Sequence, residues 1–86
     1  MAILALTGLS TRKLLILRLL SSRPDAYGLD LVSLSNGVLE RGTIYIMLAD
    51  LEDRGFVTSR LENVEDASGR LPRRIYAITA QGKTLV

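Results

Sequence analysis

The sequence predicts an α+β domain in which three helices precede a two-stranded β-hairpin and a short closing helix. Three observations predict it. Apolar residues recur at helical spacing in three segments before Gly55, apolar and polar residues alternate in two segments after it, and Pro24 and Asn36-Gly37 separate the helical segments. Because two strands alone are marginally stable, the hairpin is expected to pack on the helices. A length of 86 residues allows one domain, residues 1–86.

The first two helices are predicted between Ser10 and Asn36-Gly37. Ser10 is a fair N-cap for a helix that runs to about Ser21, and apolar residues cover more than half of its circumference, as is typical of a central buried helix. Pro24 ends this helix, because proline cannot continue it. Asp25 is expected to cap the second helix, which Asn36-Gly37 closes. The predicted apolar stripe of the second helix is Tyr27, Leu31 and Leu34.

The third helix is predicted over Arg41–Arg54, after a short turn from Asn36 to Leu39 or Glu40. A short turn suits two helices that cross steeply, which leaves the third helix with a free outer face. Gly55 stands where a left-handed C-cap belongs. The predicted buried stripe of the third helix is Ile44, Leu48 and Leu51.

The rest of the chain predicts the hairpin and the closing helix. Phe56–Val64 is rich in β-branched and alternating residues, and Arg74–Thr79 has the same character. Residues 65–73 between them are expected to form the hairpin tip. Thr79 is expected to cap one or two helical turns within residues 80–86.

The composition argues against an enzyme. The chain has no histidine and no cysteine, so it lacks the commonest metal ligand, the commonest general base near neutral pH and any thiol chemistry. It also lacks a P-loop and a glycine-rich nucleotide fingerprint. The carboxylates of Glu62, Glu65 and Asp66 lie in or next to the predicted hairpin tip, where an active site is not held rigid. We therefore expect no catalytic residue, no metal and no cofactor.

The charge distribution indicates a polyanionic partner. Eleven Lys/Arg against nine Asp/Glu give a net charge of +2, but the charges are separated along the chain. Residues 1–23 and the tail from Arg70 carry bases and no acids, whereas residues 40–66 carry most of the acids. Such blocks favour a nucleic acid as partner, although solubility alone also explains them.

The first nine residues, MAILALTGL, are predicted to form an apolar N-terminal arm, residues 1–9. The run is too short to span a bilayer, and no basic region precedes it, so neither a transmembrane helix nor a signal peptide is expected. Together with the lack of cysteine, this pattern predicts a cytoplasmic protein with no membrane partner.

Three helices followed by a hairpin are the elements of a winged helix-turn-helix domain, whose third helix enters the major groove of DNA. Spare N–H groups at the start of that helix attract phosphate, and Arg41 adds a guanidinium fork. Arginines on the hairpin, or wing, suit the DNA backbone or the minor groove. The predicted contacts with double-stranded DNA are Arg41, Gly42, Thr43, Tyr45, Ile46, Arg70, Arg73 and Arg74. A plain exposed helix and a solvated loop are the alternatives, and a core position explains Tyr45 equally well.

Several motifs, in order and at consistent spacing, resemble those of PadR-like transcriptional regulators. The opening of the second helix and the signature of the third are similar to theirs in Asp25-Ala26-Tyr27-Gly28, Gly42-Thr43-Ile44-Tyr45, Leu48, Leu51, Glu52 and Gly55. The wing and closing strand are similar in Ser59-Arg60-Leu61, Gly69-Arg70, Arg73–Thr79 and Gly82. The resemblance implies a dimeric transcription factor, in most cases a repressor. It also implies that an unknown small-molecule effector is possible, because some relatives release DNA on binding one.

The chain departs from its relatives in two places. Many of them have a small polar cap and a proline where this chain has Glu40 and Arg41, so the start of the third helix is less firmly fixed. Relatives also build their dimer with a long C-terminal helix, of which only residues 80–86 are present here. A homodimer is still expected, with the N-terminal arm as a substitute interface. The residues expected in that interface are Ile3, Leu4, Leu6 and Leu9.

A second function class remains open at this point: a winged-helix adaptor that has lost DNA binding and recognises a protein. The acidic middle of the chain and the short C-terminal helix favour it slightly. Titration with duplex DNA at two salt concentrations separates the two classes, because phosphate contacts give binding a steep salt dependence.

Overall fold

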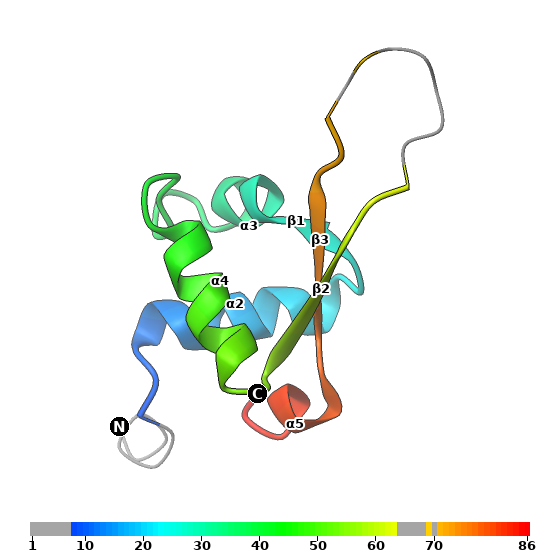
Figure 1. Cartoon of the computed structure of the whole chain (residues 1–86). Coiled ribbons are helices and arrows are strands. Elements are labelled where there is room, and N and C mark those ends of the chain that lie inside the picture. The colour runs from blue at the N-terminus through cyan, green and yellow to red at the C-terminus, as the bar shows by residue number, and fades with distance from the viewer. Residues whose placement is uncertain (1–7, 64–68, 70) are drawn as a thin grey trace.

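The computed structural model describes residues 8–63, 69 and 71–86 and has the predicted α+β winged-helix architecture. In Figure 1, α4 crosses α2, and the β-hairpin stands beside the helices. The three strands form one antiparallel sheet in the order β1–β3–β2. The elements in chain order are α2 (Thr11–Ser22), β1 (Ala26–Tyr27), α3 (Gly28–Leu34), α4 (Ile44–Asp53), β2 (Val57–Leu61), β3 (Arg74–Ile78) and α5 (Ala80–Lys83).

The central helix α2 forms as its sequence predicts. The hydroxyl of Ser10 accepts a hydrogen bond from the backbone N–H of Lys13 at 3.2 Å, which caps the helix. The helix is buried on several sides, and it contributes four residues to the core. The core consists of Leu9, Leu14, Ile16, Leu17, Leu20, Ala26, Leu31, Leu39, Ile44, Leu48, Leu51, Val57 and Tyr76.

The start of α3 differs from the prediction, because Asp25 does not cap it. Ala26 and Tyr27 instead form β1, a third strand that pairs with β3. The side chain of Asp25 lies 3.3 Å from the guanidinium of Arg60. The cap comes from inside the helix, where the carboxylate of Asp30 accepts a hydrogen bond from the N–H of Tyr27 at 3.0 Å. The predicted stripe is only partly correct, since Leu31 is fully buried while Tyr27 is half-buried and Leu34 is exposed.

Helix α4 begins at Ile44, three residues later than predicted. Arg41, Gly42 and Thr43 lie in a turn before it, in which the carbonyl of Glu40 accepts hydrogen bonds from the N–H groups of Thr43 and Ile44. A glycine and the lack of a strong capping residue at position 40 explain the late start. The connection from α3 therefore spans residues 35–43 and is longer than the short turn expected from the sequence.

The connection between α3 and α4 is nevertheless well held. Asn36 and Gly37 adopt positive φ values of 53° and 90°, which agrees with the predicted stop signal. The hydroxyl of the buried Ser35 donates to the carbonyl of Val32 at 2.8 Å and accepts from the N–H of Leu39 at 2.9 Å. These bonds satisfy polar groups where the chain turns after α3.

The hairpin and the closing helix follow the prediction with shorter limits. Strand β2 runs over Val57–Leu61 and pairs with β3, with Ser59 opposite Tyr76. Tyr76 is 5% exposed, and burial raises the pKa of its phenol. The hydroxyl of Thr79 accepts from the N–H of Gly82 at 3.0 Å, which caps α5.

Some predicted features lie outside the described residues. They are most of the N-terminal arm, including Ile3, Leu4 and Leu6, and part of the hairpin tip, including Arg70. Within the part of the chain that the structure describes, no helix has the length and apolarity needed to cross a membrane.

Candidate nucleic-acid interface

The start of α4 and the turn before it present an exposed surface above a buried stripe. Ile44, Leu48 and Leu51 are fully buried, as predicted, and they anchor α4 on the core. The opposite side of the same turn is open, with Tyr45 48% exposed and Ile46 71% exposed. The front of α4 therefore offers apolar and hydroxyl groups to a partner. The remaining predicted contacts in this region, Arg41, Gly42 and Thr43, are all exposed.

Tyr45 lies against the start of α3. A Cβ atom added to Gly28 would lie 2.6 Å from Cε1 of the Tyr45 ring and 3.0 Å from its Cζ. Gly28 has an ordinary φ, so it is the tyrosine ring and not the backbone that requires glycine there. The two segments singled out in the sequence, Tyr27-Gly28 and Gly42–Tyr45, thus meet in space. The sequence alone carries no signal of this contact.

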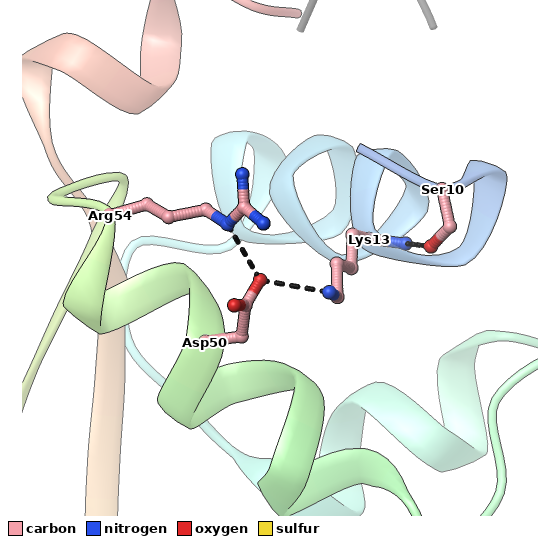
Figure 2. A network of polar contacts seen from close by, with 4 residues as sticks. All are labelled: Ser10, Lys13, Asp50 and Arg54. Carbon is pink, nitrogen blue, oxygen red and sulfur yellow. Dashed lines mark hydrogen bonds and ion pairs between the residues drawn. The ribbon is translucent and has the colours of Figure 1, made fainter. Parts of the chain in front are cut away.

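Two of the acids on α4 are engaged by the protein itself. Figure 2 shows the carboxylate of Asp50 between Lys13 of α2 and Arg54, with both nitrogens 2.8 Å from Oδ2. The hydrogen bond from Lys13, with that from Arg54, lowers the pKa of Asp50 below its ordinary value of 3.8. Glu52 accepts hydrogen bonds from the hydroxyl of Ser59 at 2.9 Å. Asp50 is therefore paired with two cations of the protein and adds less repulsion toward a polyanion than a free carboxylate would.

Replacing Asp50 by asparagine is expected to lower the thermal midpoint near neutral pH, because the ion pairs with Lys13 and Arg54 are lost. The pKa of Asp50 is depressed in the folded state, so its contribution is present above about pH 4 and disappears as the pH falls through the lowered value. Thermal unfolding of both proteins from pH 7 to pH 3 should show the difference shrink with acid. Asp53→Asn, at an exposed position of the same helix, is the control. A difference as large at pH 3 as at pH 7 would contradict this origin.

The two described wing arginines have different surroundings. A guanidinium nitrogen of Arg74 donates to the hydroxyl of Ser59 at 3.0 Å, so its side chain is tied to the neighbouring strand. The guanidinium carbon of Arg73 lies 3.8 Å from the centroid of the Tyr27 ring. Both side chains are exposed, but they contact different partners.

The predicted dimer residue that the structure describes, Leu9, belongs to the core. It is 3% exposed, so it has little surface left for a second chain. Among the described residues, no group of three or more histidine, cysteine, aspartate or glutamate side chains is placed to hold a metal ion.

Comparison with known proteins identifies the family of this domain. The transcriptional regulator PadR-like family matches residues 16–86. The chain belongs to this family. A search of curated protein sequences finds no significant match.

Solved structures of PadR-like regulators have the same fold. A PadR family transcription regulator from Clostridium difficile is 26% identical with a TM-score of 0.73, and the match covers 87% of this chain and 78% of that one. Bacillus subtilis PadR, solved in complex with operator DNA, is 28% identical with a TM-score of 0.73. That match covers 86% of this chain but only 43% of PadR, so this chain spans less than half the length of that relative.

A shorter protein is also similar to this PadR-like chain. Stf76 from the Sulfolobus islandicus plasmid-virus pSSVx is 25% identical with a TM-score of 0.64. The match covers 91% of this chain and 95% of Stf76, so the two have nearly the same extent.

Proposed function

We propose that this PadR-like chain is a sequence-specific DNA-binding regulator of transcription that acts as a repressor. In this proposal, α4 enters the major groove with Tyr45 and Ile46, and Arg41, Gly42 and Thr43 approach the adjoining backbone. The observation that carries the proposal is the open front of α4, where Ile46 is 71% exposed directly above a fully buried stripe. The complex of Bacillus subtilis PadR with operator DNA supports it by analogy.

The wing supplies the second part of the proposed interface. Arg73 and Arg74 are exposed at the start of β3, and Arg70 precedes them in the sequence. Cations there are suited to phosphates beside the groove that α4 occupies. We also propose that the protein is cytoplasmic, as the sequence predicts, because a regulator of this kind must be in the same compartment as its DNA.

Titration with duplex DNA tests the proposal. A protein that makes about five phosphate contacts should have a log–log salt slope near −4 to −5. A pool of random duplexes, selected for binding, supplies the preferred sequence. Absence of binding even at low salt would refute DNA recognition and favour the adaptor function.

We propose in addition that the chain binds as a homodimer. Two-fold symmetry then requires a near-palindromic site with half-sites about 34 Å apart. Sedimentation of the protein with and without the selected duplex measures the stoichiometry, and one chain per symmetric site would contradict the dimer.

Ile46 is expected to read the C5-methyl group of a thymine. An exposed aliphatic side chain at the front of α4 has no polar atom with which to bind a base, so apolar contact is the readout open to it. Ile46→Ala should weaken binding to the selected duplex roughly fivefold, or about 1 kcal/mol. Replacing the contacted thymine by deoxyuridine should weaken the wild-type protein to a similar degree and leave the variant unaffected. A wild-type protein that is indifferent to deoxyuridine throughout the site would rule out this contact.

A further inference from the structure

Three side chains from separate segments form a cluster at the base of the wing. Tyr27 ends β1, Glu62 follows β2 and Arg73 precedes β3. The hydroxyl of Tyr27 donates to Oε2 of Glu62 at 2.5 Å. The backbone N–H of Arg73 donates to Oε1 of the same carboxylate at 3.2 Å, and the Nε atom of Arg73 lies 3.5 Å from it. The guanidinium of Arg73 is also stacked on the Tyr27 ring, 3.8 Å from its centroid. We call these three residues the wing-base cluster.

The acid and the base of the wing-base cluster differ in exposure. The side chain of Glu62 is 10% exposed, whereas that of Arg73 is 55% exposed. A carboxylate that is nearly withdrawn from water needs hydrogen bonds and an opposite charge, and Tyr27 and Arg73 supply both. The negative charge therefore acts within the protein, while the positive group that it holds remains available at the surface.

The contacts of Arg73 leave its terminal nitrogens available. Its Nε atom is turned toward Glu62, and the flat face of the guanidinium lies on Tyr27. Among the described residues, neither terminal nitrogen of Arg73 has a hydrogen-bond partner. These two nitrogens form the fork that matches phosphate oxygens. A long side chain that is already ordered loses less entropy when it binds, so holding the stem raises the affinity of the fork.

We propose that Tyr27 and Glu62 are positioning residues that hold Arg73 ready for a phosphate of bound DNA. This inference rests on the proposed DNA-binding function and adds a role for an acid and a tyrosine outside α4. The opposite arrangement, in which Glu62 withholds Arg73 from DNA, makes the opposite prediction for the same substitution.

Glu62→Gln distinguishes positioning from simple electrostatics by the sign of its effect. Removing an acid close to a polyanion should tighten binding if charge alone matters. If Glu62 positions Arg73, the substitution should instead weaken binding to the selected duplex about three- to tenfold. In an Arg73→Ala background, where the guanidinium that Glu62 is proposed to position is absent, it should no longer weaken binding. Arg73→Ala itself should reduce the salt slope by about one unit. Asp53→Asn is the matched control and should leave binding unchanged or slightly tighter.

The outcomes are distinguishable. Thermal unfolding first establishes that each variant is folded. If Glu62→Gln does not fold, Tyr27→Phe is compared instead in the wild-type and Arg73→Ala backgrounds. That substitution removes the hydroxyl and keeps the ring on which Arg73 is stacked. Equal or tighter binding by folded Glu62→Gln overturns the inference while DNA binding stands, and tighter binding identifies Glu62 as a competitor of DNA. Equal weakening in both backgrounds also overturns it, because the effect then does not pass through Arg73. If the wild-type protein binds no duplex at low salt, the proposed function fails and the inference falls with it.

Discussion

Gly82→Ala is expected to destabilise the domain by about 2–3 kcal/mol and to lower its thermal midpoint by roughly 10–20 °C. A Cβ atom at Gly82 would lie 2.2 Å from the carbonyl oxygen of Phe56 and 2.8 Å from Cγ1 of Ile78. The first of these is a backbone atom, and its carbonyl accepts a hydrogen bond from the N–H of Thr79 at 3.0 Å. The clash is therefore not relieved by a side-chain rotation, and α5 must move away from the backbone of Phe56.

Helix propensity predicts the opposite result for the same substitution. Gly82 lies within α5, where alanine is favoured over glycine by about 1 kcal/mol. The steric cost exceeds this gain because the added atom meets fixed backbone. Gly42→Ala is the matched control, since its Cβ atom would have no neighbour within 4 Å and its φ is ordinary. Chemical denaturation of the three proteins measures the difference. A Gly82→Ala protein as stable as the wild type would mean that α5 is not packed on Phe56 as the structure has it.

The helical core was predictable from the sequence because its signals are local. The spacing of Ile44, Leu48 and Leu51, the Ser10 cap and the Gly55 stop each depend on residues within a few turns of one another. All three features are present: the stripe is fully buried, Ser10 caps α2 and Gly55 has a φ of 83°. The hairpin was predictable for the same reason, since alternation within each strand is also a local pattern.

Features that depend on distant pairing were not predictable. Strand β1 has only two residues, too few to show any periodicity, and it exists because Ala26 and Tyr27 pair with Tyr76 and Ile75. That pairing displaced the expected cap at Asp25. The late start of α4 has a local cause. The sequence shows residues unfavourable for the start of a helix before Ile44, but it does not show by how many residues they delay that start.

In the candidate site too, local features were predictable and long-range contacts were not. The exposed front of α4 is the opposite side of a predictable stripe, so spacing alone placed Ile46 there. Tyr45 lies at the flank of that stripe, and the sequence left open whether it is exposed or part of the core; the structure leaves it 48% exposed. Asp50 and Arg54 are four residues apart on one helix, so their ion pair can be expected from the sequence. The ion pair of Asp50 with Lys13 joins two helices and cannot be expected from the sequence. In the sequence, Glu62 stood out only as one of three carboxylates near the hairpin tip. Its contacts with Tyr27 and Arg73 depend on the sheet and indicate the positioning role proposed for it.

Gly28→Ala is expected to weaken DNA binding about tenfold with little change in stability. The added Cβ atom would lie 2.6 Å from the ring of Tyr45, which is 48% exposed and can swing toward solvent. The clash is therefore relieved by moving the ring, so the free energy of unfolding should change by less than about 1 kcal/mol. Moving the ring displaces its hydroxyl from the front of α4. A lost contact with a base or a phosphate in this position costs about 1–3 kcal/mol of binding free energy, and tenfold lies within that range.

A double-mutant cycle with Tyr45→Ala tests whether Gly28 acts through the ring. In the Tyr45→Ala background the ring is absent, so adding Gly28→Ala should cause no further loss of affinity for the selected duplex. Gly42→Ala is not a control for binding, because Gly42 lies in the proposed interface. The variants at Gly42 and Gly82 are therefore compared only in stability measurements. The same loss of affinity in both backgrounds would mean that Gly28 affects DNA binding by another route, such as the orientation of α3. A loss confined to the background that retains Tyr45 would show that glycine at the start of α3 is needed to seat a DNA-contacting side chain of α4.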